Sequence, residues 1–361
     1  CAACLESSQP GAPEALLLRG HVFHSLHRFK DAEKAGRQLA ETRGLPVDFG
    51  LLGDALMEQG RLAEAAEAYQ RMMDLKPDMH AYSRAAHLRW LKGDLDGAIG
   101  AMRVAMTGAG PRNAENAAWM ASKLAGYLWQ AEKFEEADRY CQTALGFMPD
   151  FAPALGLRGR MLLAVGRGEE AIQPLQRAAE LNPLPENEWA LLEALESVGQ
   201  SSEAASVAAR LASRGALEDP RSFAIYLSTR GINAAKAVEF AQRELVERAD
   251  PVTYDTLAWA CAMKGDFEDA RRYSAKAMSE GTRDPRMLFH AAIVEAKTCD
   301  ATAASLEALH RRFEEASTLA RMLLPSEQAL LQAAAAEAFA ANKAAAAKAD
   351  LLPTDLTAAA P

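Results

Sequence analysis

Apolar residues along this chain recur at intervals of three and four, in short segments that end at a glycine or a proline. Residues 51–77 and 253–278 show the pattern most plainly. Each segment has an apolar stretch, a glycine, an aromatic residue or leucine two positions later, an alanine three positions further on, and a second apolar stretch. Because residues three and four apart share one face of an α-helix, each segment is expected to form two amphipathic helices joined by a tight turn.

The alanine near the start of each second helix is an anchor that recurs through the chain. Successive anchors are 33 or 34 residues apart, except for one step of 39 between Ala98 and Ala137. Glycine and proline at 107–111 mark an inserted loop at that step. Twelve positions before the anchor, where two helices must approach closely, seven of nine residues are Gly or Ala, which supports the alignment. The anchors are Ala32, Ala65, Ala98, Ala137, Ala171, Ala204, Ala237, Ala270 and Ala304.

In period and pattern the chain resembles the tetratricopeptide repeat, a helix-turn-helix unit of about 34 residues. The resemblance extends from about Pro13 to Gly281 and weakens from Asp284 to Leu324. It implies an all-α protein, a right-handed α-solenoid of about nine units, in which the concave face commonly binds other molecules. The strings GLLGDALMEQG (50–60) and TYDTLAWA (253–260) are also similar to a group of bacterial multi-repeat proteins of this family, which implies no reaction and no ligand.

The repeat pattern divides the chain into four parts. Residues 1–12 form an N-terminal segment, and residues 13–324 form the solenoid. Pro325 and Ser326 then begin an alanine-rich helix, 325–349, which is expected to cap the open end of the array. Residues 350–361 are expected to be a frayed tail. The units are expected to start near residues 13, 46, 79, 118, 152, 185, 218, 251 and 285.

The overall composition narrows the classes of function. The formal net charge is −9, and no run of Lys and Arg stands out, so nucleic-acid binding is not expected. No stretch approaches about 18 consecutive apolar residues, so no transmembrane segment is expected. The five cysteines are dispersed, and Cys141, Cys261 and Cys299 indicate small buried residues rather than a disulfide framework.

The chain begins Cys1-Ala2-Ala3-Cys4, with neither an initiator methionine nor a basic and apolar leader. Two interpretations stay open. The sequence is a piece of a longer protein, or it is a mature bacterial lipoprotein that carries a lipid anchor on Cys1. The expected location is accordingly the cytoplasm of a bacterium or, for a lipid-anchored protein, its periplasm.

One stripe on the first helix of each unit is the candidate binding surface. It comprises the positions 18, 15, 11, 8 and 7 before the anchor, which are expected to line the concave groove. All five tryptophans fall on it, and Trp, Tyr and Arg often dominate the energy of an interface. The alternative is that these rings fill the seam between neighbouring helices. The expected partner-binding groove comprises Trp90, Trp119, Trp129, Trp189, Trp259, Tyr226, His80, Arg84, His87, Arg160 and Arg230.

Catalytic and metal-binding patterns are absent from the sequence. It has no GxxxxGK[ST], GxSxG or HExxH string. His21, His24 and His27 do not converge on one helix face, and Cys1 with Cys4 is a weak signal, so no metal and no cofactor is expected. No asparagine falls on the stripe, so a clamp for a C-terminal carboxylate, known in one branch of the family, is not expected.

These observations predict a non-catalytic protein–protein interaction scaffold that binds a peptide or a partner helix in an aromatic-lined concave groove. The alternative from another class is the repeat arm of a larger enzyme, a glycosyltransferase or a peptidase, whose catalytic domain is absent from this chain.

Overall fold

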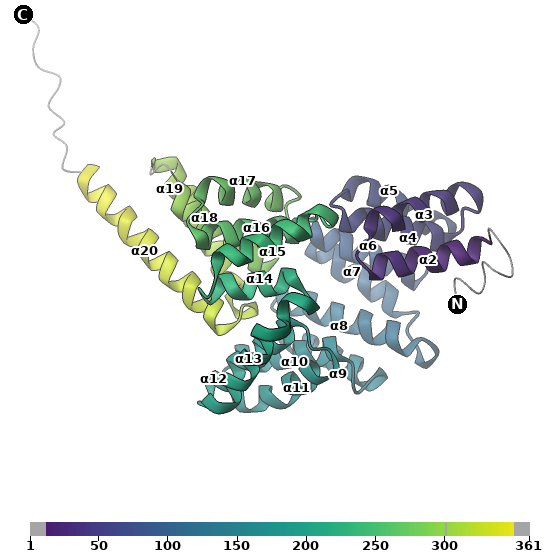
Figure 1. Cartoon of the computed structure of the whole chain (residues 1–361), viewed down its shortest axis with the longest axis horizontal. Coiled ribbons are helices and arrows are strands. Elements are labelled where there is room, and N and C mark those ends of the chain that lie inside the picture. Colours follow the sequence, from purple (N-terminus) through teal and green to yellow (C-terminus); the bar gives the residue numbers. More distant parts are fainter. Residues whose placement is uncertain (1–11, 300–301, 350–361) are drawn as a thin grey trace, which may run out of the picture.

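Pairs of antiparallel helices follow one another through the chain, for which a computed structural model describes residues 12–299 and 302–349 (Figure 1). The described residues contain helices and turns only, so the expected all-α solenoid is confirmed. The helix pairs are α2 (Pro13–Ser25) with α3 (Phe29–Thr42), α4 (Pro46–Glu58) with α5 (Leu62–Leu75), α6 (Met79–Leu91) with α7 (Leu95–Met106), α8 (Ala114–Gln130) with α9 (Phe134–Phe147), α10 (Ala152–Ala164) with α11 (Gly168–Leu181), α12 (Pro185–Ser197) with α13 (Ser201–Glu218), α14 (Pro220–Thr229) with α15 (Ala234–Glu247), α16 (Pro251–Lys264) with α17 (Phe267–Met278), and α18 (Pro285–Thr298) with α19 (Ala303–Thr318).

Three further elements complete the described chain. The 3₁₀ turn η1 (Pro111–Asn113) precedes α8, and a second one, η2 (Ala320–Met322), follows α19. The last helix, α20 (Pro325–Ala349), extends away from the body of the protein (Figure 1). None of the helices in the described ranges is both long and apolar enough to cross a membrane.

Local sequence explains where the helices begin and how the pairs close. Many first helices start with proline, which lacks the amide hydrogen that the first helical position leaves unbonded in any case. Anchor alanines such as Ala65 and Ala98 are fully buried between the two helices of their pair. At Gly53 the second helix comes so close that a β-carbon would lie 2.3 Å from a ring atom of Tyr69. Small residues are therefore required at these positions by contact distance.

The last anchor behaves differently from the others. Ala304 is exposed, because α19 begins at Ala303 and places Ala304 at its second position. Ala65 and Ala270, by comparison, are the fourth residues of their helices. The apolar contacts of α19 come instead from Leu309 and Phe313, which are buried.

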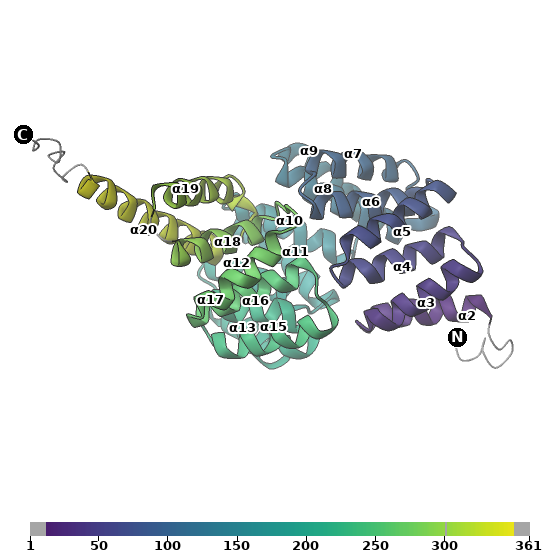
Figure 2. The same ribbon diagram turned by 90° about the horizontal axis from the view of Figure 1, so that it is seen from above.

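The solenoid curves until its two halves meet. The helices α14–α19 lie beside α2–α7, while α8–α13 connect them (Figures 1 and 2). The turn between α4 and α5 packs so closely on the loop before α16 that a β-carbon on Gly60 would lie 2.2 Å from the carbonyl oxygen of Ala249. The turn between α6 and α7 does the same one unit later, where Gly93 meets the carbonyl of Gly281. Units far apart in sequence are thus in direct contact.

Polar contacts cross the same seam. Lys92 Nζ lies 3.0 Å from Glu280 Oε2. The guanidinium of Arg248 pairs with Glu58. Lys30 Nζ donates to the backbone carbonyl of Val246 over 3.1 Å. The closed arrangement is therefore held by ion pairs and hydrogen bonds as well as by close packing.

Candidate functional site

Closure of the solenoid surrounds a cavity of about 500 Å³ on its concave side, which we call the central cavity. Its walls come from the first helices α6, α8, α10, α14, α16 and α18, from the first turn of α12 with the loop before it, and from η2. Its lining includes His87, Trp90, Lys123, Tyr127, Trp129, Gln130, Arg160, Glu186, Asn187, Arg286, Met322 and Leu323.

Aromatic rings form one wall of the central cavity. The indole of Trp90 stacks on the His87 imidazole, with 5.6 Å between ring centres, and lies 6.0 Å from the ring of Tyr127. Trp90 Nε1 donates to Gln130 Oε1 over 2.8 Å, which fixes the orientation of the ring. Burial lowers the pKa of His87 to about 3, so its imidazole is neutral near pH 7. This wall is therefore apolar and uncharged.

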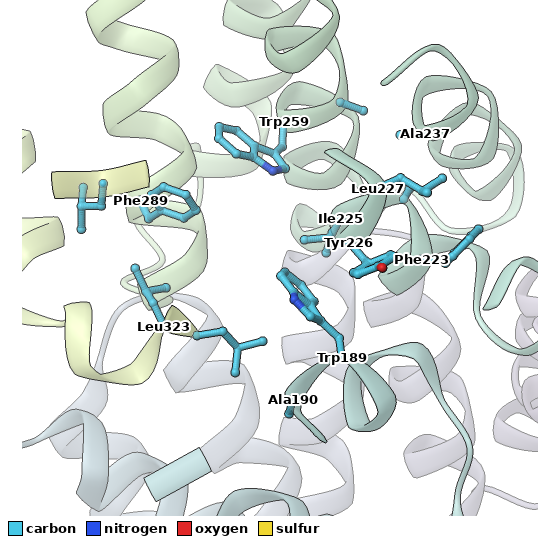
Figure 3. Packing of buried hydrophobic residues seen from close by; sticks show 14 of the residues in the cluster. Trp189, Ala190, Phe223, Ile225, Tyr226, Leu227, Ala237, Trp259, Phe289 and Leu323 are labelled. Carbon is cyan, nitrogen blue, oxygen red and sulfur yellow. The ribbon is translucent and has the colours of Figure 1, made fainter. Parts of the chain in front are cut away.

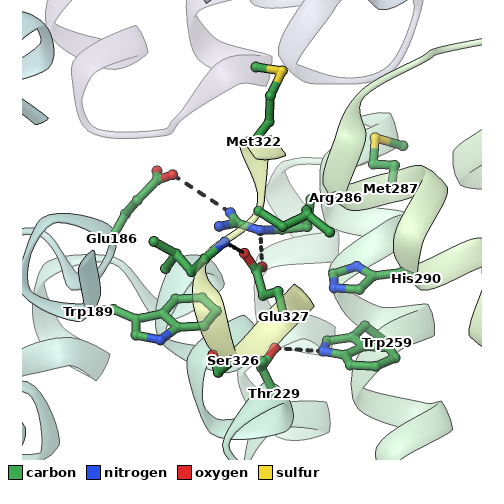
Figure 4. A network of polar contacts seen from close by, with 12 residues as sticks. Glu186, Trp189, Thr229, Trp259, Arg286, Met287, His290, Met322, Ser326 and Glu327 are labelled. Carbon is green, nitrogen blue, oxygen red and sulfur yellow. Dashed lines mark hydrogen bonds and ion pairs between the residues drawn. The ribbon is translucent and has the colours of Figure 1, made fainter. Parts of the chain in front are cut away.

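Three cationic side chains surround one carboxylate on the other side. Arg160 Nη1 donates to Glu186 Oε1 over 3.1 Å, and Arg286 Nη1 lies 3.7 Å from the same oxygen. Arg286 Nε also donates to Glu327 over 2.6 Å (Figure 4). Burial by itself would raise the pKa of Glu186, but Arg286, Arg160 and Lys123 together hold it below its ordinary value. Glu186 is thus a carboxylate shared among cations.

Some nitrogen donors of these cations have no hydrogen-bond acceptor within the described part of the protein. Among the described residues, Arg160 Nε and Arg286 Nη2 are buried and have no hydrogen-bond partner. The ammonium of Lys123 pairs with no carboxylate in the described ranges, and lies 5.7 Å from the centre of the Trp119 ring. Burial lowers the pKa of Lys123. Because buried donors are nearly always satisfied, the two guanidinium nitrogens indicate a site that receives an acceptor or water.

A second hollow of about 340 Å³, the N-terminal hollow, lies along α2, α4, α6 and α8. Arg84 forms two hydrogen bonds to the carboxylate of Asp54, at 2.8 and 2.7 Å, and Tyr69 donates a third. Burial would raise the pKa of Asp54, whereas Arg84 and Tyr69 hold it below its ordinary value. Arg84 is accordingly neutralised within the fold. His87 lines both hollows, so they adjoin on the concave side.

The predicted groove residues fall into three groups, and Arg230 belongs to none of them. His87, Trp90, Trp129 and Arg160 line the central cavity. His80, Arg84 and Trp119 line the N-terminal hollow, with His87 again. Arg230 lines neither and pairs through both terminal nitrogens with Glu196, at 2.9 and 2.8 Å.

The third group is buried in the largest apolar cluster (Figure 3). Trp189, Tyr226 and Trp259 are 1 %, 4 % and 0 % exposed. Trp189 and Tyr226 are in edge contact at 5.7 Å, and Trp259 Nε1 donates to Thr229 Oγ1 over 3.0 Å. In this conformation the three rings are too deeply buried to contact a partner. Their burial agrees with the alternative that rings on the stripe fill the seam between neighbouring helices.

Several cavity residues were not selected from the sequence. Lys123 and Tyr127 lie beside the stripe rather than on it, because α8 presents a broader face to the cavity than the other first helices. Glu186 and Arg286 both stand 18 positions before their anchors, so the stripe rule alone marks them. Asn182 and Asn187 also line the cavity, from positions outside the stripe.

Two expectations from the sequence concern a metal site and a lipid anchor. Within residues 12–299 and 302–349, no three His, Cys, Asp or Glu side chains gather as a metal site requires. Cys1 and Cys4 lie outside the described residues, so the lipid anchor at Cys1 stays a prediction. The thiols of Cys141 and Cys261 are buried and free.

Comparisons with known proteins bear on the fold. The family model of the tetratricopeptide repeat matches residues 49–79. No curated protein matches the sequence. Similar solved structures include the MamA protein (17 % identity, TM-score 0.36, 47 % of this chain and 92 % of that chain), yeast Tom70 (13 %, 0.35, 94 % and 96 %) and the APC/C hetero-tetramer Cut9–Hcn1 (15 %, 0.46, 91 % and 64 %).

Proposed function

We propose, on the premise that this chain is an α-solenoid of tetratricopeptide-type repeats, that it is a non-catalytic scaffold which binds a segment of another protein on its concave side. Repeat solenoids of this kind generally serve as protein-interaction scaffolds. A catalytic domain elsewhere in a longer protein would leave this role unchanged, because the arm of an enzyme would bind through the same surface.

The size of the central cavity favours an extended peptide over a partner helix. An α-helix is about 10 Å across with its side chains, so a volume of about 500 Å³ holds little more than one helical turn. A few residues of extended chain fit the same space. The N-terminal hollow adjoins the cavity and provides room for the flanking residues of such a peptide.

The free hydrogen-bond donors favour an acidic side chain among apolar neighbours in the bound segment. Within the described ranges, Arg160 Nε and Arg286 Nη2 are buried without a hydrogen-bond partner and the Lys123 ammonium forms no ion pair, although Asp255 and Asp284 line the cavity as well as Glu186. A carboxylate from the partner would accept from these donors away from bulk water, where such bonds are strong. The proposal rests chiefly on the Lys123 ammonium, which pairs with no described carboxylate and lies 5.7 Å from the centre of the Trp119 ring.

Selection of peptides from a random display library on the full chain tests this proposal. Enriched peptides are expected to carry an acidic residue, and their dissociation constant, measured by fluorescence anisotropy, is expected to rise at least tenfold in Lys123→Met. Lys133→Met is the matched control, since Lys133 is exposed in the turn of the same unit. Equal affinity of the enriched peptides for both variants, or no enrichment at all, would contradict the proposal.

A further inference from the structure

The segment that follows the last helix pair crosses the concave side of the solenoid. We call residues 322–327 the closing segment; it joins η2 to the first turn of α20. Arg160 Nη2, on α10, donates to the carbonyl of Met322 over 2.8 Å. The amide of Ser326 donates to Glu193 on α12 over 2.8 Å, and Arg286 on α18 binds Glu327 (Figure 4). Three helices from the fifth, sixth and ninth units thus bind one short segment.

Apolar contacts accompany these polar ones. Leu323 and Leu324 are 4 % and 2 % exposed and belong to the cluster that contains Trp189 and Phe289 (Figure 3). Met322 and Leu323 also line the central cavity. The closing segment therefore forms part of the cavity wall and shuts that side of it.

Capping of the solenoid does not require these contacts. A capping helix needs to cover only the apolar face of the last unit. The later part of α20 does so, since Phe339 contacts the rings of His310 and Phe313 on α19, with 4.7 and 5.9 Å between centres. The bonds to Arg160 and Glu193 reach back to units three and four places earlier and cover no open end.

The polar residues that bind the closing segment would lose hydrogen-bond partners if the segment moved away. Glu193 is 2 % exposed, and its acceptors are met by Trp189 Nε1 at 2.5 Å and by the amide and hydroxyl of Ser326. Burial raises the pKa of Glu193 despite these donors. If the segment left, Arg160, Glu193 and Arg286 would each lose a partner, and buried polar groups without partners are costly. A replacement must therefore offer a carbonyl, a donor and a carboxylate.

We propose that the closing segment is an intramolecular ligand on the concave side of the solenoid, and that the external partner is a peptide of the same chemistry which displaces it. That chemistry is two apolar residues, a proline, a serine and an acidic residue, as in Leu323-Leu324-Pro325-Ser326-Glu327. The displacement rests on the proposed function; occupation of the seat by this chain's own segment does not. Because the segment is tethered, its high effective concentration limits access by the partner.

A peptide added in trans to the full chain tests the proposal. The probe is a fluorescein-labelled peptide of residues 319–333, with a scrambled peptide as control. Leu324→Asp places a carboxylate at a buried position and is expected to expel the closing segment, so that the probe binds at least tenfold more tightly than to the native chain. Leu217→Asp is the matched control, because Leu217 is 85 % exposed. Adding Glu193→Gln to Leu324→Asp is expected to weaken probe binding again.

Each result decides the matter. Circular dichroism establishes that the variants keep their helices; if Leu324→Asp unfolds, the milder Ser326→Ala, Glu327→Gln pair replaces it. Equal binding of the probe to native chain and folded variant, or binding to neither, would overturn the proposal. If library-selected peptides bind native chain and variant equally, the scaffold function stands and displacement fails. If only the probe binds, the intramolecular ligand stands without the external partner.

Discussion

Gly60 and Ala249 stand in direct contact across the seam of the solenoid, so close that a β-carbon on Gly60 would lie 2.2 Å from the carbonyl oxygen of Ala249. Gly60 also has a positive φ of 71°, which other residues adopt only with strain. The contact joins the second helix pair to the loop before the eighth. It shows that the two halves of the solenoid meet, so that both of them border the concave side.

Substitutions at Gly60 and Gly166 together separate the effect of the seam contact on stability from the effect of backbone strain. Gly166 has a similar φ of 76°, but a β-carbon added there would meet no atom within 4 Å. Gly166→Ala is therefore expected to lower the free energy of unfolding by about 1 kcal/mol through strain alone. Gly60→Ala must also displace the loop at Ala249 and is expected to cost about 3 kcal/mol in all. Urea denaturation of both variants measures the difference; equal losses would mean that the seam is open in solution.

Replacement of Lys123 is expected to stabilise the protein while it weakens binding. Lys123 is half-buried, its ammonium forms no ion pair with a described residue, and desolvation lowers its pKa, so the charged form opposes folding. Lys123→Met keeps the apolar stem and is expected to raise the free energy of unfolding by roughly 1 kcal/mol. Lys133→Met, at an exposed position, is expected to change it by less than about 0.5 kcal/mol. A destabilised Lys123→Met would show that the ammonium has a structural role.

Burial of His87 predicts a loss of stability in mild acid. Its pKa is lowered to about 3 in the folded protein, so below pH 6.5 the unfolded chain takes up a proton that the folded chain does not. The contribution is present above pH 6.5 and is lost as pH falls, by up to about 2 kcal/mol at pH 5. His87→Asn should reduce the slope of unfolding free energy against pH between 7 and 5. His80→Asn, at an exposed position, is the control, and identical slopes in both variants would contradict the burial argument.

The tryptophans are expected to divide by burial rather than by their place on the stripe. Trp259→Ala empties a fully buried site and is expected to cost about 3–5 kcal/mol of unfolding free energy. Trp119→Ala, at a half-buried position in the N-terminal hollow, is expected to cost about 1 kcal/mol. Thermal denaturation compares the two. Similar losses would place Trp119 in the core as well.

Much of the fold follows from local sequence. The anchor alanines and the turn glycines are set by contacts between neighbouring helices, so a repeat of 33 or 34 residues is enough to predict the hairpins. Ala304 shows the limit of this approach. The last unit departs from the pattern, so the regular spacing of the anchors no longer predicts that this alanine is buried. The stripe rule gives the direction in which a side chain points, which is a local property.

Whether such a side chain is buried depends on residues that are far away in the sequence. Trp189 and Trp90 both point to the concave side, yet Trp189 is 1 % exposed while Trp90 lines a cavity. The difference arises from α18 and the closing segment, more than 90 residues further along the chain. The curvature that brings them there accumulates from small rotations between units and has no motif of its own. For the same reason the sequence does not mark Lys123 as a cavity residue.

The central claim, that the solenoid closes on itself, is tested most directly by zero-length carbodiimide cross-linking with mass spectrometry. Lys92 Nζ and Glu280 Oε2 are 3.0 Å apart across the seam, and Lys264 Nζ and Asp266 Oδ2 are 2.6 Å apart within one turn. The account predicts that dilute, monomeric protein yields both cross-linked peptides. A product containing the Lys264–Asp266 link but no Lys92–Glu280 link would contradict it.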